Sequence, residues 1–141
     1  MRPVGLSAVT VARLFAAGRV AAGAAILLRP EALARALQVD TSTARHMSWL
    51  ARMFGIRDLV LGAGTLLALT RGGQPLPWLL ASAASDAVDA TTLGGGLRSR
   101  QVGAVPAVLA GGLAAASVAV QLAAAAERGT AGSEPDASGA G

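Results

Sequence analysis

The chain contains no cysteine, lysine, asparagine or tyrosine, and it has few aromatic or charged residues. The absence of cysteine excludes disulfides and thiolate metal ligands. Aromatic residues make up 3% and charged residues 14% of the 141 residues, whereas about a quarter of an ordinary soluble domain is charged. These shortages argue against a soluble globular core.

The basic residues do not indicate nucleic-acid binding. All 12 are arginine, and the formal net charge is +4, which in a soluble domain would suggest a nucleic-acid partner. Here several arginines interrupt apolar runs instead of covering one open face, and few aromatic side chains are available to stack on bases. We therefore expect no nucleic-acid partner. The chain has one histidine, His46, and hence no second histidine for a metal site, so we expect neither a metal nor a cofactor.

Apolar residues make up 53% of the chain, and the mean hydropathy is +0.55. They are mostly alanine, leucine and valine, accompanied by 18 glycines. Small residues allow helices to approach closely inside membranes. About 20 apolar residues in a helix cross a hydrocarbon core about 30 Å thick. The composition therefore predicts an all-α integral membrane protein, with the lipid bilayer as its first partner.

Four segments have the length and character of membrane spans. They cover residues of about 6–28, 47–70, 76–93 and 102–126. We predict that they form a four-helix transmembrane bundle, which makes residues 1–126 one membrane domain. The glycine triplet at 94–96 is poor helix material and should end the third helix. Residues 127–141, rich in glycine, serine, alanine and acids, predict a disordered tail.

The connection between the first two spans has a pattern of its own. Arg29 and Pro30 end the first span, and the following segment, 31–39, places Leu33 and Leu37 on one side of a helix. This pattern predicts a short amphipathic helix at the membrane interface between spans 1 and 2. A connecting loop explains the same residues equally well.

The third span carries two carboxylates, Asp86 and Asp89, near its middle. Its four leucines and one valine favour insertion by about 2 to 3 kcal/mol, whereas two central aspartates oppose it by about 5 to 7 kcal/mol. Alone, this helix should insert poorly, so its acids need partners on neighbouring helices. Arg19 of the first span and Arg57 of the second can supply them.

Helical spacing groups these ionisable residues on shared faces. Asp86 and Asp89 lie three positions apart and share a face with Ser82. Such a face should turn toward the bundle interior and away from lipid. The predicted polar core consists of Arg19, Arg57, Asp58, Ser82, Asp86 and Asp89. With Arg13 and Arg52 included, four arginines would meet three aspartates inside the membrane, close to neutrality.

These residues leave two interpretations open. Arg–Asp pairs can lock helices in register, with little net stabilisation because desolvation offsets the attraction. Alternatively, they can line a polar cavity that binds or relays something, in which the neighbouring carboxylates share a proton or the arginines hold an anionic group.

Three function classes follow from these interpretations. The favoured one is an accessory or structural membrane component with an intramembrane Arg–Asp network and no catalytic residues. The second is a small transporter or proton-coupled carrier using Asp86 and Asp89, which requires a water-accessible path to both. The third is a membrane-embedded isomerase or cyclase acting on a lipid-like substrate, with one of these aspartates as the acid. It requires an apolar pocket beside the carboxylates.

The arginines also predict orientation. Five lie in the loops that join spans one to two and three to four, and three lie on the opposite side. The positive-inside rule therefore favours cytoplasmic loops with both termini outside. We expect a multi-pass protein of the cell inner (cytoplasmic) membrane, as a homo-oligomer or within a larger membrane complex.

Four patterns carry a family resemblance: Arg19-x3-Gly23, Arg29-Pro30, R-x-F-G-I-R-D-L-x-L-G from Arg52 to Gly62 and D-A-V-D from Asp86 to Asp89. The last two are the most specific. Over about residues 8–125 the chain resembles a family of small actinobacterial four-helix membrane proteins of unknown function. It is more distantly similar to the DoxX-like group of small membrane proteins. The resemblance implies four helices and an integral membrane location, and it brings no activity, cofactor or catalytic residue. The DoxX-like similarity implies an association with quinone-linked or thiol redox complexes, although a chain without cysteine has no thiol role of its own.

Overall fold

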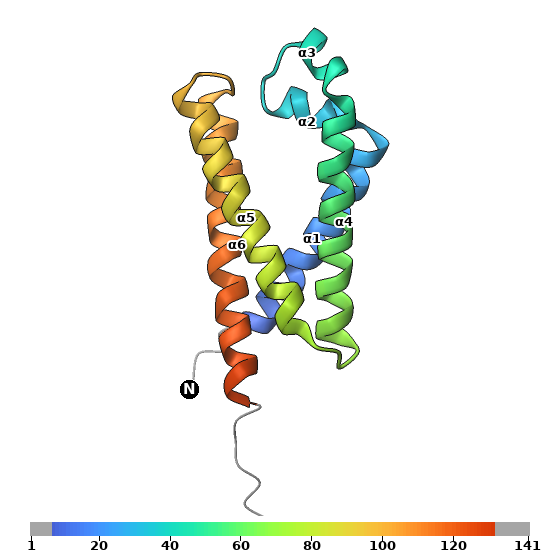
Figure 1. Cartoon of the computed structure of the whole chain (residues 1–141), viewed down its shortest axis with the longest axis vertical. Helices are drawn as coiled ribbons and strands as arrows, with labels where there is room; N and C mark the ends of the chain where they lie inside the picture. Colours follow the sequence, from blue (N-terminus) through green and yellow to red (C-terminus); the bar gives the residue numbers. More distant parts are fainter. Residues whose placement is uncertain (1–6, 132–141) are drawn as a thin grey trace, which may run out of the picture.

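The regular secondary structure of the described part of the chain is entirely helical (Figure 1). The computed structural model describes residues 7–131, and the side chains of residues 7–128. The predicted all-α class is therefore confirmed. The helices in chain order are α1 (Ala8–Leu28), α2 (Pro30–Ala36), α3 (Thr41–His46), α4 (Ser48–Thr70), α5 (Pro75–Arg98) and α6 (Ala104–Ala131).

Three of the long helices, α1, α4 and α6, are long and apolar enough to cross a membrane. This supports the expectation of a membrane protein. The remaining long helix, α5, has 24 residues, but Asp86, Asp89 and its glycine, serine and threonine residues reduce its hydropathy. Length and composition alone thus give three crossing helices and not the four that we expected.

Two helix ends differ from the expected boundaries. Helix α5 continues through the glycine triplet 94–96 to Arg98, and α6 continues to Ala131. Each glycine costs about 1 kcal/mol of helix propensity, but the antiparallel pairing of α5 with α6 outweighs this cost. Residues 127–131 are therefore helical, in contrast to the disorder predicted for them, and residues 132–141 of the expected tail lie outside the described part.

Two short helices connect α1 to α4. Helix α2 covers most of the predicted amphipathic segment, and Pro30 occupies its first position, where a missing N–H costs nothing. Helix α3 was not predicted; its N-cap is Asp40, whose Oδ1 accepts hydrogen bonds from the backbone N–H groups of Ser42 (3.1 Å) and Thr43 (3.0 Å). The hydrogen bonds from the Ser42 side chain and from Thr43 hold the pKa of Asp40 well below its usual value.

The long helices form two antiparallel pairs, α1 with α4 and α5 with α6. Figure 1 shows the pairs close together at the end that holds the α4–α5 turn and further apart at the end that holds α2 and α3. At the close end, Leu79 and Ala124 are fully buried and form an apolar core with Leu69. Trp78 of α5 packs directly on Gly64 of α4. The two pairs are thus joined by apolar contacts at this end, and at the other end the backbone N–H of Gly103 donates to the carbonyl oxygen of Leu37 at 3.3 Å.

Glycine determines how closely α1 and α4 approach. A Cβ atom on Gly23 would lie 2.6 Å from the carbonyl oxygen of Gly55, and one on Gly62 would lie 2.8 Å from that of Ala16. The two backbones are therefore in direct contact, as in other interfaces that small residues form between membrane helices. This is the face of α1 that carries Arg19.

Candidate functional site

A cavity of about 860 Å³ is lined by residues of both helix pairs. Its wall is mostly apolar and includes Phe15 and Ile26 of α1, Leu37 after α2, and Leu93 of α5. Small-molecule sites typically have volumes of about 300 to 1,000 Å³ and a predominantly apolar lining with a few polar groups. The cavity therefore has the size and character of a ligand site.

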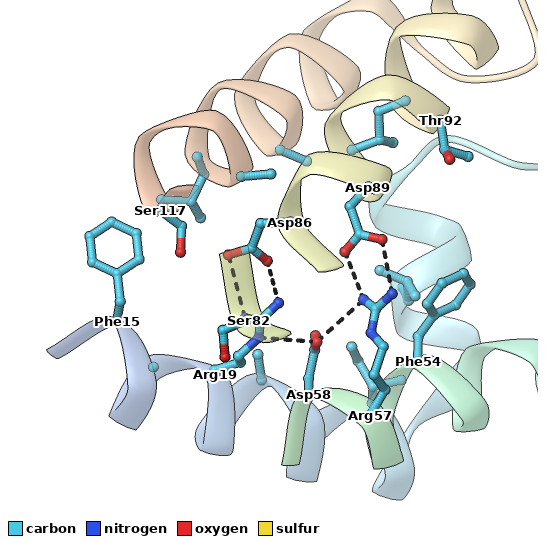
Figure 2. Close-up of a pocket in the computed structure, with 18 of the residues that line it drawn as sticks. Phe15, Arg19, Phe54, Arg57, Asp58, Ser82, Asp86, Asp89, Thr92 and Ser117 are labelled. Atoms are coloured by element: carbon cyan, nitrogen blue, oxygen red, sulfur yellow. Dashed lines mark hydrogen bonds and ion pairs between the residues drawn. The ribbon is translucent and has the colours of Figure 1, made fainter. Parts of the chain in front are cut away.

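All six residues of the predicted polar core line this cavity. Arg19 comes from α1, Arg57 and Asp58 come from α4, and Ser82, Asp86 and Asp89 come from α5. Figure 2 shows their polar atoms pointing toward one another across the gap between these helices. The structure thus brings together all the residues that helical spacing selected.

Arg19 joins three helices through its guanidinium group. Its Nη2 pairs with Oδ1 of Asp86, and its Nη1 donates to Oδ2 of the same carboxylate at 3.4 Å. Its Nε donates to Oδ1 of Asp58 at 3.2 Å. Because Asp86 is on α5 and Asp58 is on α4, this one side chain connects the α1–α4 pair to α5.

Arg57 makes the second connection between the pairs. Its Nη1 and Nη2 donate to the two oxygens of Asp89 at 3.0 and 2.7 Å, the bidentate geometry that is strongest for arginine and carboxylate. Its Nη2 also donates to Oδ1 of Asp58 at 3.3 Å. The ring of Phe54 lies under the guanidinium, 4.9 Å from centroid to Cζ, a favourable cation–π distance.

Asp58 is the centre of the resulting Arg–Asp network, which we define as Arg19, Arg57, Asp58, Asp86 and Asp89. Both guanidinium groups reach the same oxygen, Oδ1 of Asp58. Its other oxygen, Oδ2, has no hydrogen bond to any residue in the described part of the chain. The pairs therefore form one continuous series in which Asp58 is shared (Figure 2).

The network is buried at one end and partly open at the other. The side chains of Asp86 and Arg19 are 7% and 12% exposed, whereas those of Asp89 and Arg57 are 27% and 29% exposed. Each carboxylate of α5 faces its own guanidinium, so the structure does not favour a proton shared between Asp86 and Asp89. Asp89 is therefore less buried than Asp86.

The network contains fewer arginines than the four that we expected. Arg13 donates from Nη2 to the carbonyl oxygen of Leu69 at 2.6 Å, which satisfies one of the last carbonyls of α4, and Arg52 is exposed. Neither belongs to the network. Two guanidinium groups therefore meet three carboxylates, which leaves an excess of one negative charge when all are ionised.

Three polar residues of the site were not predicted. Gln121 of α6 donates from Nε2 to Oδ2 of Asp86 at 2.9 Å and to Oγ of Ser117 at 2.8 Å. Thr65 and Ser82 share a hydrogen bond of 3.2 Å. The signal for the first two was present, because Ser117 and Gln121 lie one helical turn apart in an otherwise apolar span. Both residues line the cavity.

Comparisons with known proteins supply no function for this site. No family model, no curated protein and no solved structure matches the chain. The resemblance described above therefore stays a prediction. Within residues 7–131 no group of three or more histidine, cysteine, aspartate or glutamate side chains is placed to hold a metal ion.

Proposed function

We propose that this protein is an integral membrane protein that binds a lipid-like molecule in the cavity between its two helix pairs. The observation that carries the proposal is the combination of a mostly apolar volume of about 860 Å³ with a single ionised network on its wall. The apolar lining suits a hydrocarbon body, and the network suits a polar head. Ionisable residues inside a membrane are costly and usually mark such functional positions.

The same pairs support a fourth membrane crossing by α5. The cost of inserting Asp86 and Asp89 falls when each carboxylate is bonded to an arginine of the α1–α4 pair. We propose a four-helix transmembrane bundle of α1, α4, α5 and α6, with α2 as an interfacial helix. We further propose that both described ends of the chain lie on the outer side of the cell inner membrane, opposite the cytoplasm. We also propose that the chain acts as a homo-oligomer or in a larger complex.

A cysteine-free chain offers a direct test of the fourth crossing. Single cysteines at Gln74→Cys and Ser99→Cys mark the exposed turns before and after α5. A membrane-impermeant maleimide should label the Gln74→Cys chain from outside intact cells and the Ser99→Cys chain only in inverted vesicles. The chain without a substitution should stay unlabelled. Labelling of both positions from the same side would show that α5 does not cross.

Ligand binding can be tested with two adjacent alanines of α6. Ala114 lines the cavity, whereas Ala115 is exposed and does not. Protein purified in mild detergent should retain a lipid-like molecule, identified by native mass spectrometry and by extraction. Ala114→Phe should reduce the retained amount at least about tenfold, because the ring occupies the cavity, and Ala115→Phe should leave it unchanged. Equal retention in both variants would contradict binding in this cavity.

A structural role in a membrane complex is the second candidate. It is supported by the arginines themselves, since Arg19 and Arg57 each bond carboxylates on α4 and α5 and so tie the helix pairs together. In this role the network serves as a lock and the cavity stays empty of specific ligand. The retention experiment separates the two candidates, because only the binding role predicts a bound molecule that depends on Ala114.

A further inference from the structure

We infer that the molecule held in this cavity carries a cationic, hydrogen-bond-donating head group of the primary ammonium type. The inference rests on the proposed function, since it specifies the ligand of the same cavity. It also reverses the expectation that the arginines hold an anionic group. Three observations point to this head group: the net charge of the cavity wall, the carboxylates that already occupy the two arginines, and the oxygens that accept no hydrogen bond.

The charge of the cavity wall is the first observation. The charged side chains that line it are those of the Arg–Asp network, two guanidinium groups and three carboxylates. Opposite charges attract more strongly in a mostly apolar site than in water. An ammonium group would therefore neutralise the wall, whereas a carboxylate or phosphate would raise the negative excess.

The arginines are already occupied, which is the second observation. Arg57 presents both terminal nitrogens to Asp89, and Arg19 presents both to Asp86. An anionic head would have to replace one of these carboxylates, which would leave a buried aspartate without its partner. Arg57 Nε has no partner among the described residues, but it is buried and so is not presented to a ligand in the cavity.

The unused acceptors are the third observation. Oδ1 of Asp58 accepts from both guanidinium groups, whereas its Oδ2 accepts no hydrogen bond from the described residues. The Asp58 side chain is 19% exposed. Gln121 is 4% exposed, and its Oε1 is buried without a donor in the described part. Its amide orientation is determined by Asp86 and Ser117, which both receive hydrogen bonds from Nε2. An ammonium group has three donors and no acceptor, so it suits a cavity-lining carboxylate with an unused oxygen, such as Asp58.

The test is a competition among three probes with the same hydrocarbon chain. Purified, delipidated protein in mild detergent at pH 7 is mixed with equal amounts of hexadecylamine, hexadecanol and hexadecanoate, and bound masses are measured by native mass spectrometry. At this pH the amine is cationic and the carboxylate anionic, as the lysine and glutamate side chains are. We expect the amine to be retained at least about tenfold more than the carboxylate.

Asp58→Asn should abolish this preference, because it removes the excess charge while keeping the size of the side chain. Asp40→Asn is the matched control: it makes the same change in net charge at an exposed cap far from the cavity lining, and it should keep the preference. If Asp58→Asn does not fold, the wild-type competition alone still decides.

The outcomes separate this inference from the proposed function. Equal retention of all three probes, or a preference for the alcohol or the carboxylate, would overturn the cationic head group and leave binding in the cavity standing. Retention of none of the probes would contradict both. Preference for the amine in Asp58→Asn as well as in wild type would overturn the role given to the excess charge.

Discussion

The interface between α1 and α4 and the interface between the two helix pairs are built in opposite ways. In the first, Gly23 and Gly55 bring two backbones into contact, and no side chain separates them at that point. In the second, the pairs meet through apolar residues such as Leu79 at the end that holds the α4–α5 turn, and beyond that end the Arg–Asp network spans the distance. Close backbone contact leaves no room for a ligand, whereas the charged bridge keeps two helix pairs connected around a cavity.

Arg19 takes part in both interfaces. Arg19 lies on the close-packed face of α1, between Ala16, which contacts Gly62, and Gly23, which contacts Gly55. It bonds Asp58 across that interface. Its terminal nitrogens then continue to Asp86 on α5. Shape complementarity therefore positions α1 on α4, and this packing places Arg19 where it can bond α5.

Breaking the charged bridge should have the largest effect. Asp86→Ala removes the carboxylate that both terminal nitrogens of Arg19 and the amide of Gln121 bond, and it should destabilise the protein by about 3 to 5 kcal/mol. Asp89→Ala should cost less, because its partner Arg57 is 29% exposed and so is less desolvated than Arg19. Thermal unfolding in detergent, followed by circular dichroism, measures both.

The paired replacement Arg19→Met with Asp86→Leu checks the cause of that loss. If an unpaired buried charge is responsible, the double variant should be more stable than Asp86→Ala alone, since apolar residues of similar volume often replace a buried ion pair without loss. Equal destabilisation by Asp86→Ala and Asp89→Ala would contradict the difference in burial on which this prediction depends.

Adding a Cβ atom to the glycine contact between α1 and α4 should reduce stability less than breaking the Arg–Asp network does. Gly23→Ala places a Cβ against the backbone of Gly55, and the required shift of α1 from α4 should cost about 1 to 3 kcal/mol. Gly112→Ala is the matched control on α6, where a Cβ would meet nothing within 4 Å. It should be neutral or stabilising by up to about 1 kcal/mol through helix propensity.

The same unfolding measurement compares the two glycine variants. A loss for Gly112→Ala as large as that for Gly23→Ala would mean that glycine is required for a reason other than close approach. A neutral Gly23→Ala would show that α1 and α4 are less tightly packed than their contacts indicate.

Much of the site could be predicted from the order of residues along each helix. The three-residue spacing of Asp86 and Asp89 and the position of Arg19 among small residues place each group on a definite helical face. Which group each arginine bonds could not be predicted in the same way. Arg13 also lies in an apolar span, yet it bonds the end of α4, because its height along α1 brings it to unpaired carbonyls and not to a carboxylate.

The apolar composition and the helical periodicity determine that this chain forms long helices, because both depend on residues near one another in sequence. They also require that the aspartates of these helices pair with arginines, because an unpaired charge inside a membrane is costly. How the four long helices are shifted relative to one another along their axes depends on contacts between residues that are far apart in sequence. Only that alignment gives the network its excess negative charge, turns Gln121 toward Asp86, and leaves a cavity beside them.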